Sequence, residues 1–320
     1  MAYYVGRRGE LGIAKCDTTL RGDAVTPSLW VPYNSISFDE KVVHVDSEGA
    51  FGQIAETYEN YVAKKYAEGE FEFNLDDKAI GLILSAVAGA VPSSAGSTNY
   101  THTYTLQNTN SHLPLSILVQ DPNQAKNFPL AMVEKFTISV APEGLVKCTV
   151  GFRSARGKSW SRQTAVYTSL GNKFIHSMLS FKIAAAVADI AAASQLKIKS
   201  LELNITKNVE DFQDIGTATP TDILNKQIMV DGSFEIGFAD NTYRDYMLGG
   251  SYRAIEVLLT YGTNNSLQIQ LPKARFANWE PSKGVNDIAY EKIEFKGQYD
   301  VVNTLNVIST LVLKNQTDSY

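Results

Sequence analysis

The chain has 320 residues, 44% of them hydrophobic, which is enough for one large or two ordinary domains with a substantial core. Its net charge of −5 argues against a surface that grips nucleic acid, and its two distant cysteines, Cys16 and Cys148, exclude a disulfide framework. No stretch of about 20 apolar residues is present, so no membrane-spanning segment is expected.

The first 30 residues are predicted to form an N-terminal arm, because glycines punctuate them and Thr26-Pro27 marks the entry to a strand at 31–38. Residues 39–66 are a long polar stretch, which indicates an extended excursion such as a hairpin. The strand predicted at 69–75 follows, because apolar and polar residues alternate there.

A helix is predicted directly after this strand. One apolar stripe recurs at i, i+3, i+4 and i+7, at Ile80, Ile83, Leu84 and Val87. Asp76-Asp77 suit the N-cap, where acids meet the positive end of the helix dipole. A paired acid site is the alternative for these carboxylates, and capping is favoured because they immediately precede the stripe.

The remaining strands of a first domain at 31–155 are predicted near 100–107, 114–120, 132–140 and 145–153. A second domain at 196–303 repeats the plan with a shorter helix at 241–248 and last strands near 274–279 and 288–299. Residues 304–320 form a C-terminal strand and tail. The connector at 156–195 is open, because the alanine-rich segment 183–193 suits a helix and a strand–loop–strand entry fits nearly as well.

An internal echo supports two tandem units. Residues 68–77 and 231–240 share Gly, Phe, Glu and Asp at one fixed offset, and both alternate apolar and polar side chains. Looser matches set Ser35 on Ser200, residues 100–106 on 252–258, and residues 115–119 on 267–271. The expected fold class is therefore mainly β, with two similar sandwich or barrel units that each carry one flanking α-helix.

The chain offers no constellation typical of catalysis or of a cofactor site. The four histidines share no metal-ligand spacing, so no metal is expected and a solvated or hydrogen-bonded role is favoured for each. No glycine-rich phosphate cradle is followed by the strand and helix that it needs. A basic run is interpreted either as a solvated connector or as a contact with an acidic neighbour; it comprises Arg153, Arg156, Lys158 and Arg162.

Taken together, the order and spacing of these segments resemble the tail tube proteins of long-tailed (siphophage-type) bacteriophages, in the subgroup with two tube domains in one chain. The segments that carry the resemblance are 11–15, 30–32, 69–73 leading into 80–89, 102–104 followed by 113–117, and 311–313 with Asn315 and Tyr320. The resemblance implies a structural virion protein rather than an enzyme, located in the phage tail and assembled in the host cytoplasm.

The resemblance also implies how such chains assemble. Stacked rings form a hollow tube whose inner wall is a closed β-barrel, and two domains per chain imply a homotrimer with pseudo-sixfold symmetry, the alternative being a homohexamer. Six domains of about four strands give about 24 strands, a circumference near ~150 Å and a channel of roughly 35–40 Å. Double-stranded DNA, about 20 Å wide, would pass without specific binding. The implied partners are a tape measure protein and tail terminator or baseplate proteins.

Two sets of residues are predicted to serve this tube. The lumen-facing set lies on one face of two strands and comprises Glu70, Glu72, Asn74, Ser233 and Glu235. The alternative is that these acids face outward or pair with lysines such as Lys147. The ring-stacking set consists of aromatic residues in the polar excursions 39–66 and 205–230, and comprises Phe51, Tyr58, Tyr61 and Phe212. The competing class is a two-domain β-sandwich binding, adhesion or capsid-associated module.

Overall fold

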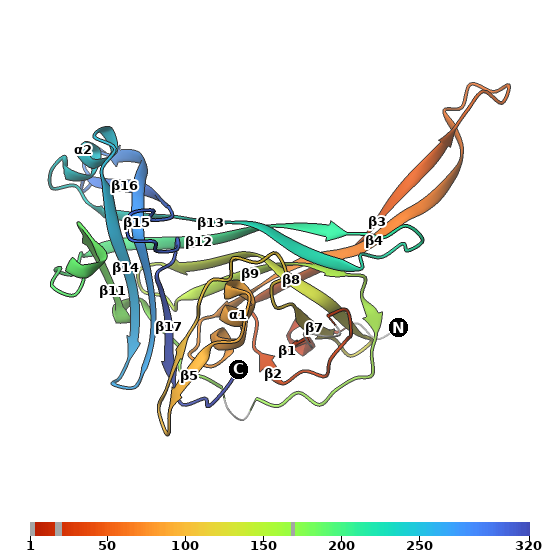
Figure 1. The fold of residues 1–320 in the computed structure, drawn as a ribbon, viewed down its shortest axis with the longest axis horizontal. Helices are drawn as coiled ribbons and strands as arrows, with labels where there is room; N and C mark the ends of the chain where they lie inside the picture. Colours follow the sequence, from red (N-terminus) through yellow and green to blue (C-terminus); the bar gives the residue numbers. More distant parts are fainter. Residues whose placement is uncertain (1–3, 17–20, 168–169) are drawn as a thin grey trace.

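The computed structural model describes residues 4–16, 21–167 and 170–320, and it is mainly β, which confirms the predicted fold class. The described residues contain two α-helices, α1 (Ala79–Ala88) and α2 (Thr242–Leu248). One long hairpin projects far from the body of the molecule (Figure 1). None of the helices in the described part of the chain has the length and apolar character needed to cross a membrane.

The first unit is built on a four-stranded antiparallel sheet in the order β3–β4–β9–β8. Its strands are β3 (Ser35–Glu48), β4 (Thr57–Asn74), β8 (Ala125–Val140) and β9 (Lys147–Ala155). The polar excursion at 39–66 is thus the outer part of the β3–β4 hairpin, because alternation of side chains continues through it.

The second unit repeats this sheet in the order β12–β13–β16–β15. Its strands are β12 (Ile198–Phe212), β13 (Asp222–Gly237), β15 (Asn265–Ser282) and β16 (Tyr290–Gly297). Ser35 pairs with Glu72 as Ser200 pairs with Glu235. Counterparts therefore differ by 165 in the first strand of the hairpin (200 − 35) and by 163 in the second (235 − 72).

The glycine shared by the two echo segments has a steric reason. A Cβ added at Gly69 would lie 2.3 Å from the Ser37 carbonyl oxygen, and one at Gly232 would lie 2.4 Å from that of Glu202. Ser37 and Glu202 are themselves counterparts under the same offset. Only a residue without a side chain permits this close backbone approach, so both hairpins need glycine at the same place.

The two four-stranded sheets join edge to edge into one sheet. Residues 135–140 of β8 pair antiparallel with residues 201–206 of β12, with Ser139 opposite Glu202. Figure 1 shows β12 and β13 running along the body beside β8 and β9. The chain therefore carries its own example of how one unit docks on the next.

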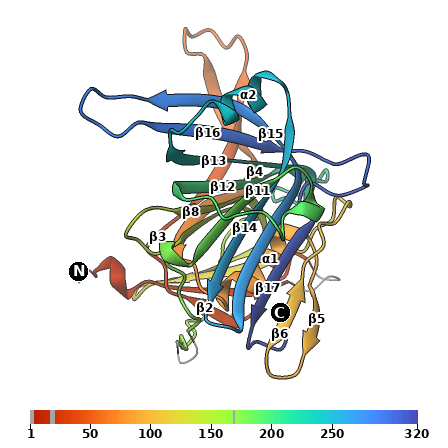
Figure 2. The same cartoon turned by 90° about the vertical axis from the view of Figure 1, so that its left-hand side faces the viewer.

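Each unit also has a smaller set of strands beside the long sheet. In the first unit these are β1 (Glu10–Lys15), β2 (Leu29–Val31), β7 (Leu115–Gln120) and β10 (Lys158–Ser159). In the second they are β11 (Leu179–Ala184), β14 (Tyr252–Tyr261) and β17 (Thr310–Asn315), seen in Figure 2. A further hairpin, β5 (Ser93–Gly96) with β6 (Tyr100–Thr103), pairs with β17.

These pairings correct two details of the echo. β1 pairs with β7 as β11 pairs with β14, and β7 and β14 pair in turn with β8 and β15. The counterpart of 115–119 therefore lies in β14, not at 267–271, and the match of 100–106 with 252–258 is wrong. Amphipathic strands resemble one another in sequence, and only their partners distinguish them.

The connector adopts the strand–loop–strand alternative. Its residues form β10, the 3-10 turn η2 (His176–Met178), β11 and the 3-10 turn η3 (Val187–Asp189). The alanine-rich stretch is therefore not an α-helix, because Ile183 and Ala184 are drawn into pairing with β14. Tertiary pairing outweighs helix propensity here.

The main core lies between the first unit's long sheet and α1. Phe71, Phe73 and Leu75 point into it from β4, and every residue of α1 is buried. Asp76 caps α1, because its Oδ1 accepts hydrogen bonds from the amides of Lys78 (3.0 Å) and Ala79 (2.6 Å). In contrast, α2 has no buried residue.

Candidate subunit interface and channel face

The face of the long sheet opposite the core is polar. Glu70, Glu72 and Asn74 lie on this face of β4, and their counterparts Ser233 and Glu235 lie on the same face of β13. Each alternates with a buried or largely buried apolar side chain, as the sequence predicts for a half-buried strand. The predicted channel set thus shares one continuous surface of the sheet.

Two of these carboxylates pair with lysines on that surface. The Glu72 Oε1 lies 3.0 Å from the Lys147 Nζ, and the Glu235 Oε1 lies 3.3 Å from the Lys199 Nζ. The pairing with Lys147 is the alternative considered from the sequence, and it coexists with a position on the polar face. Glu70 is exposed. Exposed ion pairs of this kind contribute little to stability, so these residues serve the surface rather than the fold.

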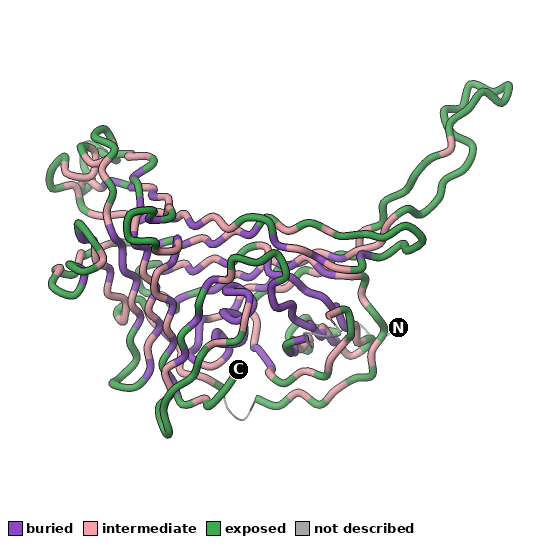
Figure 3. The backbone as a smooth tube through the Cα atoms, viewed as in Figure 1, coloured by how far each residue is buried: buried purple, intermediate pink, exposed green. Residues whose placement is uncertain are grey.

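The predicted stacking aromatics divide between two environments. Phe51 and Tyr58 contact each other at the tip of the β3–β4 hairpin with ring centroids 5.4 Å apart, and Tyr61 is exposed beside them. Phe212 ends β12 and is 52% exposed. The β12–β13 hairpin around it lies against the first unit of its own chain, whereas the outer β3–β4 hairpin stands free in solvent (Figure 3).

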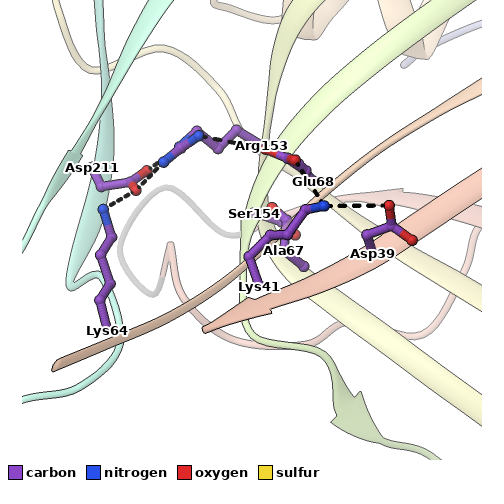
Figure 4. A network of polar contacts seen from close by, with 8 residues as sticks. All are labelled: Asp39, Lys41, Lys64, Ala67, Glu68, Arg153, Ser154 and Asp211. Carbon is purple, nitrogen blue, oxygen red and sulfur yellow. Dashed lines mark hydrogen bonds and ion pairs between the residues drawn. The ribbon is translucent and has the colours of Figure 1, made fainter. Parts of the chain in front are cut away.

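An ion cluster fixes the β12–β13 hairpin to the first unit (Figure 4). Asp211 accepts two hydrogen bonds from Arg153 of β9, Nε to Oδ1 and Nη2 to Oδ2, each 2.6 Å long. Lys64 of β4 contacts the same carboxylate, whose side chain is only 2% exposed. Burial raises the pKa of Asp211, but the hydrogen bonds from Arg153 and Lys64 outweigh it and the net pKa is lowered.

The cluster answers the question posed by the basic run. Arg153 binds Asp211, and Arg162 lies 3.1 Å from Glu10 across the connector, so both contact acidic neighbours within the chain. The hydrogen bond to Asp211 also raises the pKa of Arg153 above its ordinary value. Bidentate Arg–carboxylate geometry is the strong form of this interaction.

A buried lysine makes a second contact of the same hairpin. The Lys207 side chain donates a hydrogen bond to the Ala86 carbonyl at 2.7 Å, near the C-terminal end of α1, where carbonyl groups lack helical partners. Burial lowers the pKa of Lys207 to about 7. The hairpin therefore reads two features of the first unit, its helix end and its sheet face.

The long sheet ends in two unpaired edges. Among the described residues, β3 pairs only with β4, and the segment 278–282 of β15 pairs only with β16. Under the equivalence of the two units, β3 corresponds to β12 and this part of β15 corresponds to β8. The free edges are thus counterparts of the two strands that pair inside the chain.

The remaining chemistry-bearing residues have structural roles. The buried His102 is held by Ser94 (2.7 Å) and Asn315 (3.1 Å), and His112 contacts the Gln107 carbonyl (3.2 Å). Asp77 is held by Asn172, so the two acids preceding α1 form a cap and an anchor. Within the described residues, no cluster of three or more His, Cys, Asp or Glu side chains has the arrangement of a metal site.

The comparisons with known proteins address this geometry directly. The comparison with curated proteins finds no match to this sequence. A family model described as phage tail tube protein matches residues 49–297, which covers the outer β3–β4 hairpin, the junction between units and the long strands of both. This family is structural, self-assembling and part of the virion tail, and it is not known as an enzyme family. The match spans most of the chain, and the chain therefore belongs to the phage tail tube protein family.

Proposed function

We propose that this chain polymerises as stacked homotrimeric rings into a hollow conduit for phage DNA delivery. The observation that carries the proposal is the β8–β12 junction, which fuses two four-stranded sheets and leaves equivalent edges open at both ends. A strand edge with free N–H and C=O groups is a template for pairing with another chain. Repeating the internal junction between chains closes three copies into a ring.

The equivalence of the units gives the register of this closure. Thr137 and Glu280 are counterparts, and the offset of 143 (280 − 137) sets Ser282 on Ser139. Because Ser139 faces Glu202 inside the chain, Ser282 faces Ser37 of the next subunit. Pro281 supplies no N–H, so this ladder has one donor fewer than the internal one.

One local conflict in this register has nearby compensation. The pairing sets Asp39 opposite Glu280, and like charges directly opposite one another are unfavourable. Lys41 lies 3.5 Å from Asp39, and Lys292 is the cross-strand neighbour of Glu280, so each carboxylate has a cation beside it. The corresponding internal pair, Asn204 with Thr137, is neutral and joined by a 2.7 Å hydrogen bond.

The size of the closed sheet suits DNA. Eight strands per chain give about 24 in a trimer, with a backbone diameter near ~48 Å and a channel of roughly 35–40 Å after side chains are added. A hexamer of whole chains would double the strand number and open a far wider channel. The trimer therefore fits a duplex about 20 Å across more closely.

The polar face of the long sheet is proposed as the channel wall. The acids on it are Asp39, Glu68, Glu70, Glu72, Glu202, Asp231, Glu235, Glu280 and Glu294. The basic residues in register with them are fewer: Lys41, Lys135, Lys147, Arg153, Lys292 and Lys296. A net acidic wall repels phosphate within about one Debye length, ~8 Å, and lets DNA slide without binding.

Ring stacking is proposed for the tip of the β3–β4 hairpin. Phe51 and Tyr58 offer an exposed aromatic pair there, a composition typical of interfaces. Phe212 remains in the proposed set at the rim of the β12–β13 hairpin. Partners at the two ends of the tube, of the tape measure, terminator and baseplate kinds, would meet the same ring surfaces.

Cysteine cross-linking tests the ring and its register. Ser37→Cys with Ser282→Cys places two exposed thiols directly opposite each other, within the Cα separation of about 4.4–6.8 Å that a disulfide needs. Under oxidising conditions, assembled protein should run as covalent dimers and trimers on denaturing gels. Ser35→Cys with Ser282→Cys, two residues out of register, is the matched control and should cross-link far less.

Electron microscopy of the same samples provides the second readout. Negative stain should show rings or tubes, and the covalent ladder should stop at three chains. Monodisperse monomers would instead favour the binding or adhesion module, and a ladder reaching six chains would favour a hexamer.

A further inference from the structure

The two long hairpins are equivalent to the level of a single irregularity. In β12–β13 the register shifts between Asn208 and Val209, which leaves Lys226 unpaired. In β3–β4 it shifts between Val43 and His44, which leaves Ala63 unpaired. These positions correspond under the offsets of 165 (208 − 43) and 163 (226 − 63). A bulge bends a hairpin and increases its twist, so both hairpins leave their sheets along the same path.

The β12–β13 hairpin shows where that path leads. Beyond its bulge it crosses β4 and β9 of the preceding unit, where Asp211 receives Arg153 and Lys64. Its connecting loop adds backbone contacts, with the Lys65 amide donating to the Ala218 carbonyl at 2.6 Å and the Gln213 amide donating to the Ala63 carbonyl at 3.1 Å.

The β3–β4 hairpin has the same elements without a partner. Asp46 is the counterpart of Asp211 (211 − 46 = 165), and it is exposed. Among the described residues, no ion pair or side-chain hydrogen bond reaches Asp46. Apolar side chains around it are also exposed, at Val42 45%, Val43 43%, Val45 56%, Tyr61 60% and Val62 43%. A long apolar hairpin in solvent marks an interface.

The second unit carries the matching surface. Glu68 faces Arg153 across β4 and β9, and Asp231 faces Lys296 across β13 and β16 in the same way. Lys296 is therefore the counterpart of Arg153 (296 − 153 = 143). It is partly exposed, and within the described part of the chain it has no ion-pair partner.

We propose that the β3–β4 hairpin of each subunit lies across β13 and β16 of the neighbouring subunit, where Asp46 forms an ion pair with Lys296 of that second copy. This inference rests on the proposed trimeric ring and adds a contact that the edge pairing alone does not contain. It assigns the middle of the hairpin to contacts within a ring and leaves its tip for contacts between rings. Asp231 completes the cluster as Glu68 does in the internal junction, where it lies 3.8 Å from Arg153.

Zero-length cross-linking of the unmodified protein tests the contact. A carbodiimide joins a carboxylate to an amine only when the two touch, so treated tubes should yield a peptide pair linking Asp46 to Lys296. The pair should come from the band of two chains on a denaturing gel and be absent from unassembled protein.

Charge reversal tests the same contact by function. Asp46→Lys alone and Lys296→Asp alone should each raise the concentration needed for tube assembly by about tenfold or more, because each leaves like charges facing one another. The double variant should return to within about threefold of the wild type. Asp287→Lys, an equal change of charge at an exposed loop position, should shift assembly by less than about twofold.

The outcomes separate this inference from the ring itself. Tubes that show the Ser37–Ser282 cross-link but no Asp46–Lys296 peptide, or a double variant no better than the single ones, would overturn the hairpin contact and leave the ring intact. Absence of rings and of the Ser37–Ser282 cross-link would overturn the proposed function.

Discussion

The β3–β4 and β12–β13 hairpins share one design and differ in their surroundings. Both have long strands, a bulge at the same position and a connection of similar length, at residues 49–56 and 213–221. One is fixed by a buried carboxylate and a buried lysine, and the other stands in solvent. The difference teaches that each hairpin is built to lie on the unit preceding it in the sheet, and that a single chain supplies this support only once.

Removing each hairpin in turn should break the comparison most strongly. Replacing residues 46–60 with Asn-Gly, a two-residue hairpin turn, should leave a folded, soluble chain that no longer polymerises, because no intrachain contact is lost. Replacing residues 211–223 in the same way should instead destabilise the chain itself. Circular dichroism melting and negative-stain imaging measure the two effects, and normal tubes from the 46–60 variant would contradict the account.

The two corresponding aspartates should differ sharply in the isolated chain. Asp211→Ala should lower the free energy of unfolding by about 3 kcal/mol, because it leaves Arg153 and Lys64 as like charges without their carboxylate. Asp46→Ala should change it by less than about 0.5 kcal/mol. Denaturant titration of monomeric protein compares them, and equal losses would show that the hairpins are not distinguished by their surroundings.

The buried lysine should give the β12–β13 hairpin a pH dependence. The pKa of Lys207 is lowered to about 7, below its unfolded value of about 10.4, so between these values the unfolded chain binds more protons. Stability should therefore rise with pH in this window, by at most about 1.4 kcal/mol per pH unit. Lys207→Met should flatten the rise relative to wild type, whereas a change at its counterpart Val42 should not; parallel wild-type and Lys207→Met curves would be the contrary result.

The channel face should show the smallest structural effect. Replacing Glu70, Glu72 and Glu235 with lysine should leave assembly intact, because their contacts with neighbouring lysines are exposed and weak. DNA delivery should slow and become salt-sensitive, because phosphate contacts release counterions. The readout is the ejection rate at two salt concentrations, and an unchanged rate would place these carboxylates away from the DNA path.

Much of this arrangement was accessible from the sequence. The echo centred on Gly69 and Gly232 identifies the two hairpins, because both glycines meet a backbone carbonyl in the same way. The apolar stripe after Asp76 identifies α1, since capping and periodicity are local signals. What is local in origin is therefore predictable from local pattern.

The rest depends on pairing between distant strands. The alanine-rich connector has high helix propensity, yet part of it pairs with β14. The contact between Arg153 and Asp211 is foreshadowed only as one reading of a basic run. Asp46 and Lys296 are recognisable once the registers are known, although the match of Ser35 with Ser200, carried eleven residues further, already sets Asp46 on Asp211.

The most direct measurement is a cryo-electron microscopy map of assembled tubes at a resolution that separates strands. The account predicts three chains per ring, with β3 of one subunit antiparallel to residues 278–282 of the next and Ser37 opposite Ser282. A ring with true sixfold symmetry of whole chains, or one in which the β3 and β15 edges do not meet, would contradict it.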